Sequence, residues 1–397
     1  MDYQRPILNT LLSRMKEPRK FIQVIAGPRQ VGKTTIALEL TKRLKGLVKY
    51  HSADEMSAYG GIWIDQIWDA LRIQMNIERT TNAVLIIDEI QKIKDWSQTV
   101  KKHWDRDKRE GNEIKLVLLG SSRLLLMDGL SESLMGRFEI MHAGHWGFSE
   151  MQKAFGFSAE QYMWFGGYPG SAEFVRDEQR FKEYIRNTII ESSLVRDILL
   201  MTKIDKPALL RQMFEVGLNY SGQIVSYTKM LGQLTDAGNT TTLARYLKLL
   251  EQAGLLSGLN KYNGRMIEIK GSIPKFQVHN TALLSAMKSG SFEDALSDPA
   301  EWGSIYESSV GAHLVSEVSK YANASLYYWR ENNLEIDYVV TYGKKILGIE
   351  VKSGSESISL KASEKFKAYF PNSKLILVGK HGLRYEEFMK AGLPEII

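Results

Sequence analysis

Short apolar runs alternate with longer amphipathic stretches over the first 200 residues. Three of the runs are almost continuously hydrophobic: FIQVIAG at 21–27, AVLIIDEI at 83–90 and IKLVLLGSS at 114–122. Runs of this length predict strands buried on both faces, and the helical patterns between them predict crossover connections. We therefore expect an α/β fold with a parallel sheet and helices on both of its faces.

Helical patterns dominate the next part of the chain, from Glu150 to Met201, with a break at FGGYPGS (165–171). Three more helices and a pair of strands are then expected at Pro207–Asn219, Ser226–Leu234, Thr240–Ala253, Leu255–Leu259 and Lys275–Val278. Three helices followed by a β-pair are typical of a winged helix.

The last hundred residues alternate again between the two periodicities. The expected elements are helices at 301–321 and 360–370 and strands at 325–329, 335–341, 345–351 and 374–378. The whole pattern predicts four parts: an α/β core at 1–148, a helical lid at 149–205, a winged helix at 206–288 and a second α/β domain at 289–397.

Composition narrows the class of protein further. The chain has 397 residues, 44% hydrophobic and 25% charged, which is ordinary for a globular protein of two or three domains. It has no cysteine, which excludes disulfides, thiolate zinc sites and a cysteine nucleophile. The polar start and the lack of an apolar run near ~18 residues predict a cytoplasmic protein without a membrane anchor. The formal charge, 52 − 46 = +6, permits a polyanionic partner.

A phosphate-binding loop is predicted at residues 27–34, where GPRQVGKT matches the pattern GxxxxGK[ST]. An apolar strand precedes it and a helical pattern follows it, which is the context that the motif needs. Such a loop meets phosphate with backbone N–H groups and the positive end of a helix dipole. Lys33 is expected to reach the β- and γ-phosphates and Thr34 to hold Mg²⁺. The residues expected to contact the nucleotide are Gly27, Arg29, Gln30, Val31, Gly32, Lys33, Thr34 and Thr35.

A second part of the same site is predicted where the strand AVLII ends in Asp88-Glu89. Ligands of open parallel sheets lie outside the carboxyl ends of the strands. We expect Asp88 to approach Mg²⁺ as a Walker B aspartate does, and Glu89 to activate the attacking water as a general base. The alternative is an acidic pair at the surface that ends a strand.

Two further residues are weaker candidates for the same chemistry. Ser122 follows the third strand, where a hydroxyl can position the attacking water, although a plain serine-rich turn explains it equally well. Arg137 follows a glycine in a short loop. It can offset charge in the transition state, in its own subunit or from a neighbouring one, or it can be a solvated surface arginine.

The order of these motifs resembles the prokaryotic AAA+-type P-loop ATPases that carry a C-terminal domain of unknown function. The matching segments are GPRQVGKTT, LIIDEIQKIKDW, LLGSS, SESLMGR, FGGYPG, VSYTKM, TTLARYLKLLEQAGLL, YYWRENNLEIDYVV and IEVKSG. The resemblance implies an AAA+-like ATPase core with a lid, a winged helix and a restriction-endonuclease-like C-terminal domain. The chain departs from the family at MHAGHWGFSEM (141–151) and at His279-Asn280.

The helical middle is a candidate for nucleic-acid recognition. In helix-turn-helix proteins the corresponding helix enters the major groove with its N-terminal residues toward the bases, and here Thr240–Thr242 are expected to start that helix with hydroxyl caps. The basic side chains expected to meet phosphates are Lys229, Arg245, Lys248, Lys261 and Arg265. A protein-contact module is the alternative, because no dense basic stripe is present.

Near the C-terminus, carboxylates and a lysine follow the pattern D-x₁₂-E-x-K. Glu350 and Lys352 share a face of one strand, and Asp337 on the neighbouring strand can join them, with Glu307 from the preceding helix. The set resembles that of PD-(D/E)xK nucleases, in which the carboxylates hold Mg²⁺ and the lysine orients water. A structural Glu–Lys pair, or a fold kept for binding without cleavage, are the alternatives.

Three hypotheses about function follow. The first is an Mg²⁺-dependent ATPase that couples nucleotide turnover to binding or remodelling of DNA. The second is a nucleotide-gated switch read by a protein partner, and the third is an ATP-regulated metal nuclease. ATP is favoured over GTP because the chain lacks an N/TKxD motif in the expected place. The sequence leaves a homo-oligomer open.

Overall fold

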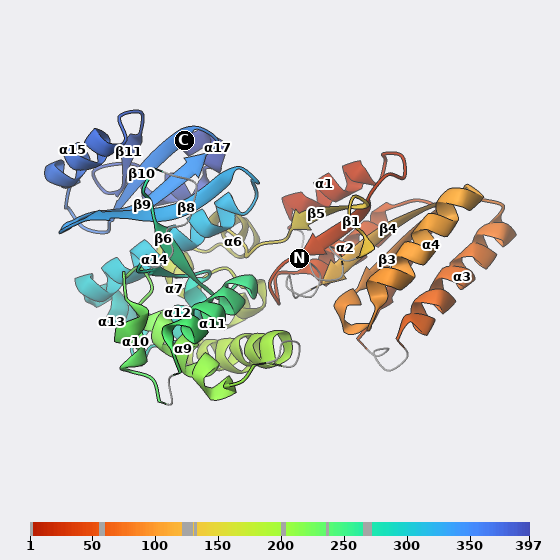
Figure 1. The fold of residues 1–397 in the computed structure, drawn as a ribbon, viewed down its shortest axis with the longest axis horizontal. Coiled ribbons are helices and arrows are strands. Elements are labelled where there is room, and N and C mark those ends of the chain that lie inside the picture. Colours follow the sequence, from red (N-terminus) through yellow and green to blue (C-terminus); the bar gives the residue numbers. More distant parts are fainter. Residues whose placement is uncertain are drawn as a thin grey trace. The chain divides into compact units, whose positions relative to one another are not determined.

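The computed structural model describes residues 3–54, 60–120, 130, 133–199, 204–235, 238–264 and 272–397. The chain divides into two compact units, one ending at Gly144 and one running from His145 to Ile397. The boundary lies four residues before the one expected from the sequence. The expected lid, winged helix and C-terminal domain all belong to the second unit (Figure 1).

The first unit is built on a five-stranded sheet in the order β2-β3-β4-β1-β5, in which every pair is parallel. Its strands are β1 (Ile22–Ala26), β2 (Leu47–Ser52), β3 (Asn82–Asp88), β4 (Glu113–Gly120) and β5 (Phe138–His142). The α/β fold and the parallel sheet are therefore confirmed, with β1, β3 and β4 at the three apolar runs. The two strands that the pattern did not predict are the edges of the sheet, where half-buried positions carry polar side chains.

Helices cover both faces of this sheet. They are α1 (Pro6–Arg14), α2 (Lys33–Arg43), α3 (Gly61–Glu78), the short turn η2 (Ile90–Lys92) and α4 (Trp96–Glu110). Alternate strand residues belong to two hydrophobic cores, one on each face of the sheet. Val24 belongs to the core beneath α3 and α4, and Ile25 belongs to the core beneath α1 and α2. Burial of both faces explains why the inner strands read as continuous apolar runs.

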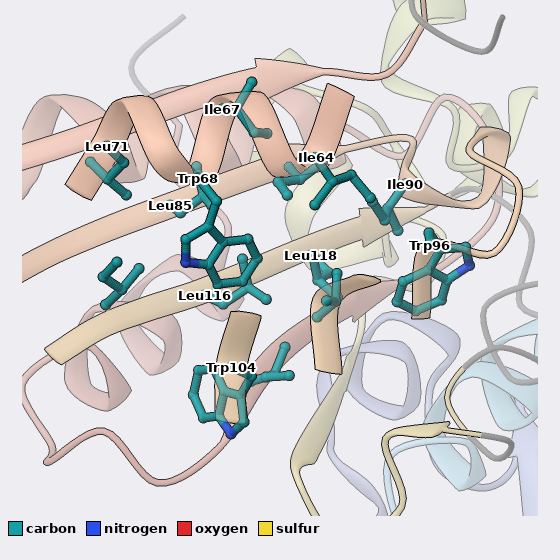
Figure 2. Packing of buried hydrophobic residues seen from close by; sticks show 14 of the residues in the cluster. Ile64, Ile67, Trp68, Leu71, Leu85, Ile90, Trp96, Trp104, Leu116 and Leu118 are labelled. Atoms are coloured by element: carbon teal, nitrogen blue, oxygen red, sulfur yellow. The ribbon is translucent and has the colours of Figure 1, made fainter. Parts of the chain in front are cut away.

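Aromatic side chains fill much of the core beneath α3 and α4. Trp68 is fully buried and lies against Leu85 and Leu116 of the sheet, with Trp104 of α4 nearby (Figure 2). Together with Trp63 and Trp96, these tryptophans belong to one hydrophobic cluster. These tryptophans therefore serve the packing of the core.

A buried polar network joins α3 to α4 behind this core. Asp107 is fully buried, and its carboxylate accepts hydrogen bonds from Trp68 Nε1 and Arg72 Nε, both at 2.8 Å. Arg72 also contacts His103 Nδ1 at 2.9 Å, and His103 Nε2 lies 2.6 Å from Asp65. Burial is the largest cause that lowers the pKa of His103, although Asp65 opposes it. The two helices are therefore held by charge pairing as well as by apolar contact.

The second unit contains a six-stranded sheet in the order β11-β10-β9-β8-β6-β7. Its strands are β6 (Leu256–Lys261), β7 (Lys275–Val278), β8 (Ala324–Glu331), β9 (Leu334–Tyr342), β10 (Lys345–Lys352) and β11 (Lys374–Gly379). Strands β6 and β7 pair with each other, as expected, and the pairing is antiparallel. However, β6 also pairs with β8 through Asn260 and Lys261. The hairpin expected to be the wing of a separate domain is thus part of the C-terminal sheet.

Helices make up the rest of the second unit. They are α6 (Phe148–Phe155), α7 (Ala159–Phe165), η3 (Pro169–Phe174), α8 (Glu178–Tyr184), the π-helical η4 (Ile185–Ile190) and η5 (Ser193–Leu199), α9 (Pro207–Asn219), α10 (Tyr227–Leu231), α11 (Thr240–Gln252), α12 (Thr281–Met287), α13 (Phe292–Ser297), α14 (Pro299–Val318), α15 (Leu360–Tyr369), α16 (Tyr385–Lys390) and α17 (Leu393–Ile396). The long helices match the expected ranges within a few residues. Among the described helices, none has the length and apolar character needed to cross a bilayer.

Replacing Asp107 with Ala should destabilise the first unit by about 3–5 kcal/mol, because it leaves the buried Arg72 guanidinium without its main counterion. Calorimetric unfolding of the full chain measures the effect. Asp105→Ala is the control, since Asp105 forms a half-exposed pair with Arg137 and should cost about 1 kcal/mol or less. Equal losses in the two variants would contradict the role assigned to Asp107.

Candidate nucleotide-binding site

The predicted phosphate loop lies at the point where the strand order reverses. After β1 the chain passes through α2 to β2 at one edge of the sheet, whereas β5 lies on the other side of β1. Ligands of open α/β sheets bind in the crevice outside the strand ends at such a switch point. The loop at 27–32 follows the last residue of β1 directly and leads into the first turn of α2.

Close approach of two backbone segments requires a glycine at position 27. A Cβ on Gly27 would lie 2.0 Å from the carbonyl O of Ala143, which follows β5. Gly32 immediately precedes α2 with φ of 85°, a left-handed conformation that favours glycine. Gln30 also has a positive φ of 60°. These conformations give the loop its tight path.

Lys33 is nearly buried and folds back over the loop. Its ammonium donates hydrogen bonds to the carbonyl oxygens of Gly27 at 2.9 Å and Pro28 at 2.6 Å. A buried ammonium needs acceptors, and here the loop supplies them. The positive charge is therefore held at the mouth of the loop, where the sequence predicts that it meets phosphate oxygens.

Asp88 links the loop to the neighbouring part of the sheet. The hydroxyl of Thr34 donates to Asp88 Oδ2 at 2.7 Å, and Tyr50 of β2 donates to the same oxygen at 3.0 Å. Burial and the nearby Asp88 carboxylate raise the pKa of Tyr50, which keeps its proton available for that bond. A hydroxyl next to a nearly buried carboxylate is an all-oxygen donor set that suits Mg²⁺, so Thr34 and Asp88 are the residues that would hold the ion. When bound, the ion supplies charge neutralisation at the phosphates.

Glu89 follows Asp88 and adopts a left-handed conformation with φ of 53°. Its backbone N–H donates to Asp88 Oδ1 at 2.8 Å, and its side-chain oxygen Oε2 accepts a hydrogen bond from Gln91 at 2.8 Å. A positive φ is uncommon for a residue other than glycine and is often found at functional sites. Gln91 fixes the orientation of the carboxylate and is a residue that the sequence did not suggest.

Sequence reasoning also missed Arg5, which precedes α1. Its guanidinium donates to the carbonyl of Val31 in the loop at 3.1 Å and to the carbonyl of Gly144 at 3.2 Å. The loop is therefore tied to the segment after β5 as well as to β1. A single arginine before Pro6 gives no periodic or motif signal, so only the tertiary structure reveals this role.

The placement of Arg137 contradicts its proposed role at the γ-phosphate of the same subunit. Arg137 directly precedes β5, and its carbonyl accepts a hydrogen bond from the N–H of Ile22, the first residue of β1. Because β5 and β1 are parallel, Arg137 lies where the strands begin, about 16 Å along the strand from the loop end. Its side chain pairs with Asp105 at 3.0 Å. The other weak candidate, Ser122, lies outside the described residues.

The expected recognition helix, α11, differs from prediction at its start. Asn239, not a threonine, caps the helix: its side-chain oxygen accepts the N–H of Thr242 at 2.9 Å. Arg245 and Lys248 are exposed on this helix, and Arg245 makes a loose pair with Asp205 at 3.5 Å. Arg265 lies outside the described residues.

The expected nuclease-like residues gather in the second unit, but with an additional cation. Lys275 of β7 is fully buried, and its Nζ lies 2.7 Å from Glu307, 3.4 Å from Glu335 and 3.9 Å from Asp337. Burial alone lowers the pKa of Lys275, but these carboxylates raise it above the usual value overall. Within the described ranges, no group of three or more Asp, Glu or His side chains has an arrangement that could hold a metal ion. The metal site at these residues stays a prediction, and the structure adds Lys275 as a cation among the carboxylates.

Glu350 and Lys352 do share a face of β10, as predicted. Lys352 Nζ lies 3.4 Å from Glu350 Oε2. Burial, and then the negative charge of Asp337, raise the pKa of Glu350 to about 7. Burial lowers the pKa of Lys352, but Asp337 and Glu350 raise it above its usual value overall. Asp337 itself accepts the backbone N–H of Val351 at 2.8 Å, so one of its oxygens serves the sheet.

Models of known families match three successive parts of the chain. Residues 19–152 match the family model described as an AAA domain. Residues 157–294 match a domain of unknown function (DUF8612), and residues 302–391 match a second one (DUF4143). None of the curated proteins matches the sequence.

Solved structures also resemble this chain. The Walker-type ATPase of Pyrococcus abyssi is 14% identical with a TM-score of 0.51, over 72% of this chain and 95% of that one. RuvB of Thermotoga maritima is 18% identical with a TM-score of 0.32, over 63% of this chain and 85% of that one. The Aeropyrum pernix ORC1 protein, in complex with DNA, is 12% identical with a TM-score of 0.32, over 73% of this chain and 92% of that one. The last two are too distant to support an argument.

The match to an AAA domain and the parallel sheet that resembles a solved Walker-type ATPase agree on an AAA-type α/β fold for the first unit. The parts that match domains of unknown function carry no such assignment.

Arg5→Ala should weaken ATP binding by about five- to tenfold, about 1 kcal/mol, because it frees the carbonyl of Val31 and loosens the loop. Titration with a fluorescent ATP analogue measures the change. Arg14→Ala, at the other end of α1, is the control, since Arg14 pairs with Glu139 of β5. Unchanged affinity in Arg5→Ala would contradict the bracing role.

Proposed function

We propose that the protein is an Mg²⁺-dependent ATPase that uses the loop at 27–34 and the pair Asp88-Glu89. The observation that carries the proposal is the hydrogen bond of 2.7 Å from Thr34 to Asp88, which brings the two halves of the motif together. A loop of the right sequence without that contact would support phosphate binding alone. The contact supports a site that also holds the ion needed for hydrolysis.

Each residue has a distinct role in this proposal. Lys33 exchanges the loop carbonyls for oxygens of the β- and γ-phosphates, and the backbone N–H groups of the loop hold the remaining charge. Thr34 and Asp88 keep oxygens ready for the ion. Glu89, oriented by Gln91, accepts a proton from the attacking water. Tyr50 steadies the Asp88 carboxylate.

Phosphate release from the purified protein tests this proposal. Lys33→Ala should lower ATP affinity by at least about tenfold, because it removes a charge-assisted contact. Glu89→Gln should retain ATP but turn over about 10²–10⁴-fold more slowly, because it removes the proton acceptor and leaves the shape unchanged.

Lys42→Ala is the control, because this exposed lysine lies on α2 and pairs with Glu39 at the surface. Turnover of wild type equal to that of Glu89→Gln would refute hydrolysis at this site. Binding lost in Glu89→Gln would refute the division of roles.

We further propose that ATP turnover is coupled to DNA binding by the second unit. The supporting observation is the exposed side of α11, which begins with Thr240 and Thr241 and carries Arg245 and Lys248. A helix with an exposed side that follows α9 and the short α10 suits a major groove. The charge of +6 also favours a polyanion. A nucleotide-gated switch that a protein partner reads is the competing proposal.

The salt dependence of DNA binding distinguishes the two. If α11 contacts phosphates, Arg245→Ala and Lys248→Ala should each weaken binding to all sequences and reduce the slope of log K against log[salt] by about 0.9. Fluorescence anisotropy with labelled duplex DNA measures both quantities. Lys320→Ala is the control. This exposed lysine of the second unit follows the end of α14 and pairs with Glu317 of that helix. No DNA binding at low salt would favour the protein-partner alternative.

A further inference from the structure

A fully buried lysine stands among the carboxylates of the second unit. Lys275 Nζ contacts Glu307 Oε1 at 2.7 Å, the carbonyl O of Asp337 at 3.0 Å and Glu335 Oε1 at 3.4 Å. The ring of Tyr338 lies 4.8 Å from the same atom. The ammonium is thus surrounded by acceptors from β9 and α14, although two strands separate β7 from β9 in the sheet order.

Further hydrogen bonds link these partners to one another and to β7. Tyr338 OH donates to Gln277 Oε1 at 2.8 Å, and it also lies 3.0 Å from the carbonyl of Glu307. Gln277 in turn donates to the carbonyl of Ser308 at 2.8 Å. Lys275 is therefore the fully buried charged centre of a polar cluster that joins β7, β9 and α14.

The cation changes what the carboxylates can do. A divalent ion binds where two or more deprotonated carboxylates converge on an otherwise unoccupied position. Here the ammonium of Lys275 already neutralises the negative charge of the converging carboxylates, and it would repel a second cation placed beside it. Glu350 forms an ion pair with Lys352, and one carboxylate oxygen of Asp337 accepts a hydrogen bond from the N–H of Val351.

We propose that the Lys275 ammonium holds this carboxylate cluster together in place of a divalent metal ion. The C-terminal sheet is then a metal-independent module that does not cleave nucleic acid. Its buried charges instead fix the β6–β7 hairpin and α14 to the sheet. The proposal concerns the second unit alone, so it stands or falls separately from ATP hydrolysis.

Calorimetric titration with Mn²⁺, without nucleotide, tests this directly. Both proteins carry Asp88→Asn to remove the ion site of the first unit, and one of them also carries Glu350→Gln. The proposal predicts identical heats in the two proteins and no nicking of supercoiled plasmid by either. Mn²⁺ binding, or plasmid nicking, that Glu350→Gln abolishes would overturn it. This comparison leaves Lys275 intact, so it does not depend on the folding of a Lys275 variant.

A second arm removes the lysine. In Lys275→Met the carboxylates lose their internal cation, so Mn²⁺ should raise the unfolding temperature of this variant and leave that of wild type unchanged. Adding Glu350→Gln should remove the gain. Lys182→Met is the control, because Lys182 is another nearly buried lysine, bonded to carbonyls of Lys288 and Gly290. A folded Lys275→Met protein with no response to Mn²⁺ would overturn the proposal.

Discussion

The hydrogen bond between Thr34 and Asp88 depends on almost every feature of the first unit. Thr34 lies in the first turn of α2, after β1, and Asp88 ends β3, with β4 between the two strands. The contact forms at 2.7 Å only if the parallel strands end at a common edge and the loop turns tightly at Gly27. The apolar cores on both faces of the sheet set that alignment. Chemistry at the edge of the sheet is therefore a consequence of packing beneath it.

Buried charges play matching roles in the two units. In the first, the carboxylate of Asp107 accepts hydrogen bonds from Arg72 and Trp68 and thereby joins two helices. In the second, Lys275 forms ion pairs with carboxylates from helix α14 and strand β9. In both cases one buried charge is surrounded by partners from segments distant in sequence. Such clusters specify which elements meet, because removing one partner leaves an uncompensated charge.

Much of this architecture could be predicted from the sequence, because it depends on local pattern. The three apolar runs became the inner strands, and a helix begins at Pro207 and another at Thr240, as the periodicity indicates. The phosphate loop was recognised by its motif. The edge strands β2 and β5 were missed because their half-buried residues do not form an apolar run.

What could not be predicted was the set of contacts that tertiary structure creates. Arg5, Tyr50 and Lys275 carry no motif, and each acts on residues at least 26 positions away in the chain. The same-subunit role considered for Arg137 does not match its position, because a loop arginine gives no information on which end of the sheet it occupies. The nuclease-like pattern correctly predicted that Glu350 and Lys352 share a strand face. Its spacing gives no information about Lys275, which comes from another strand.

The central claim is that Asp88 and Thr34 together form an ion site that serves a nucleotide in the loop. Calorimetric titration of the full chain with ATP, in Mg²⁺ and then in EDTA, tests it most directly, with Asp88→Asn as the matched variant. The account predicts that wild type binds ATP more tightly with Mg²⁺, and that Asp88→Asn loses this difference while it still binds ATP in EDTA. Affinity that is independent of Mg²⁺ in wild type, or no affinity for ATP at all, would contradict it.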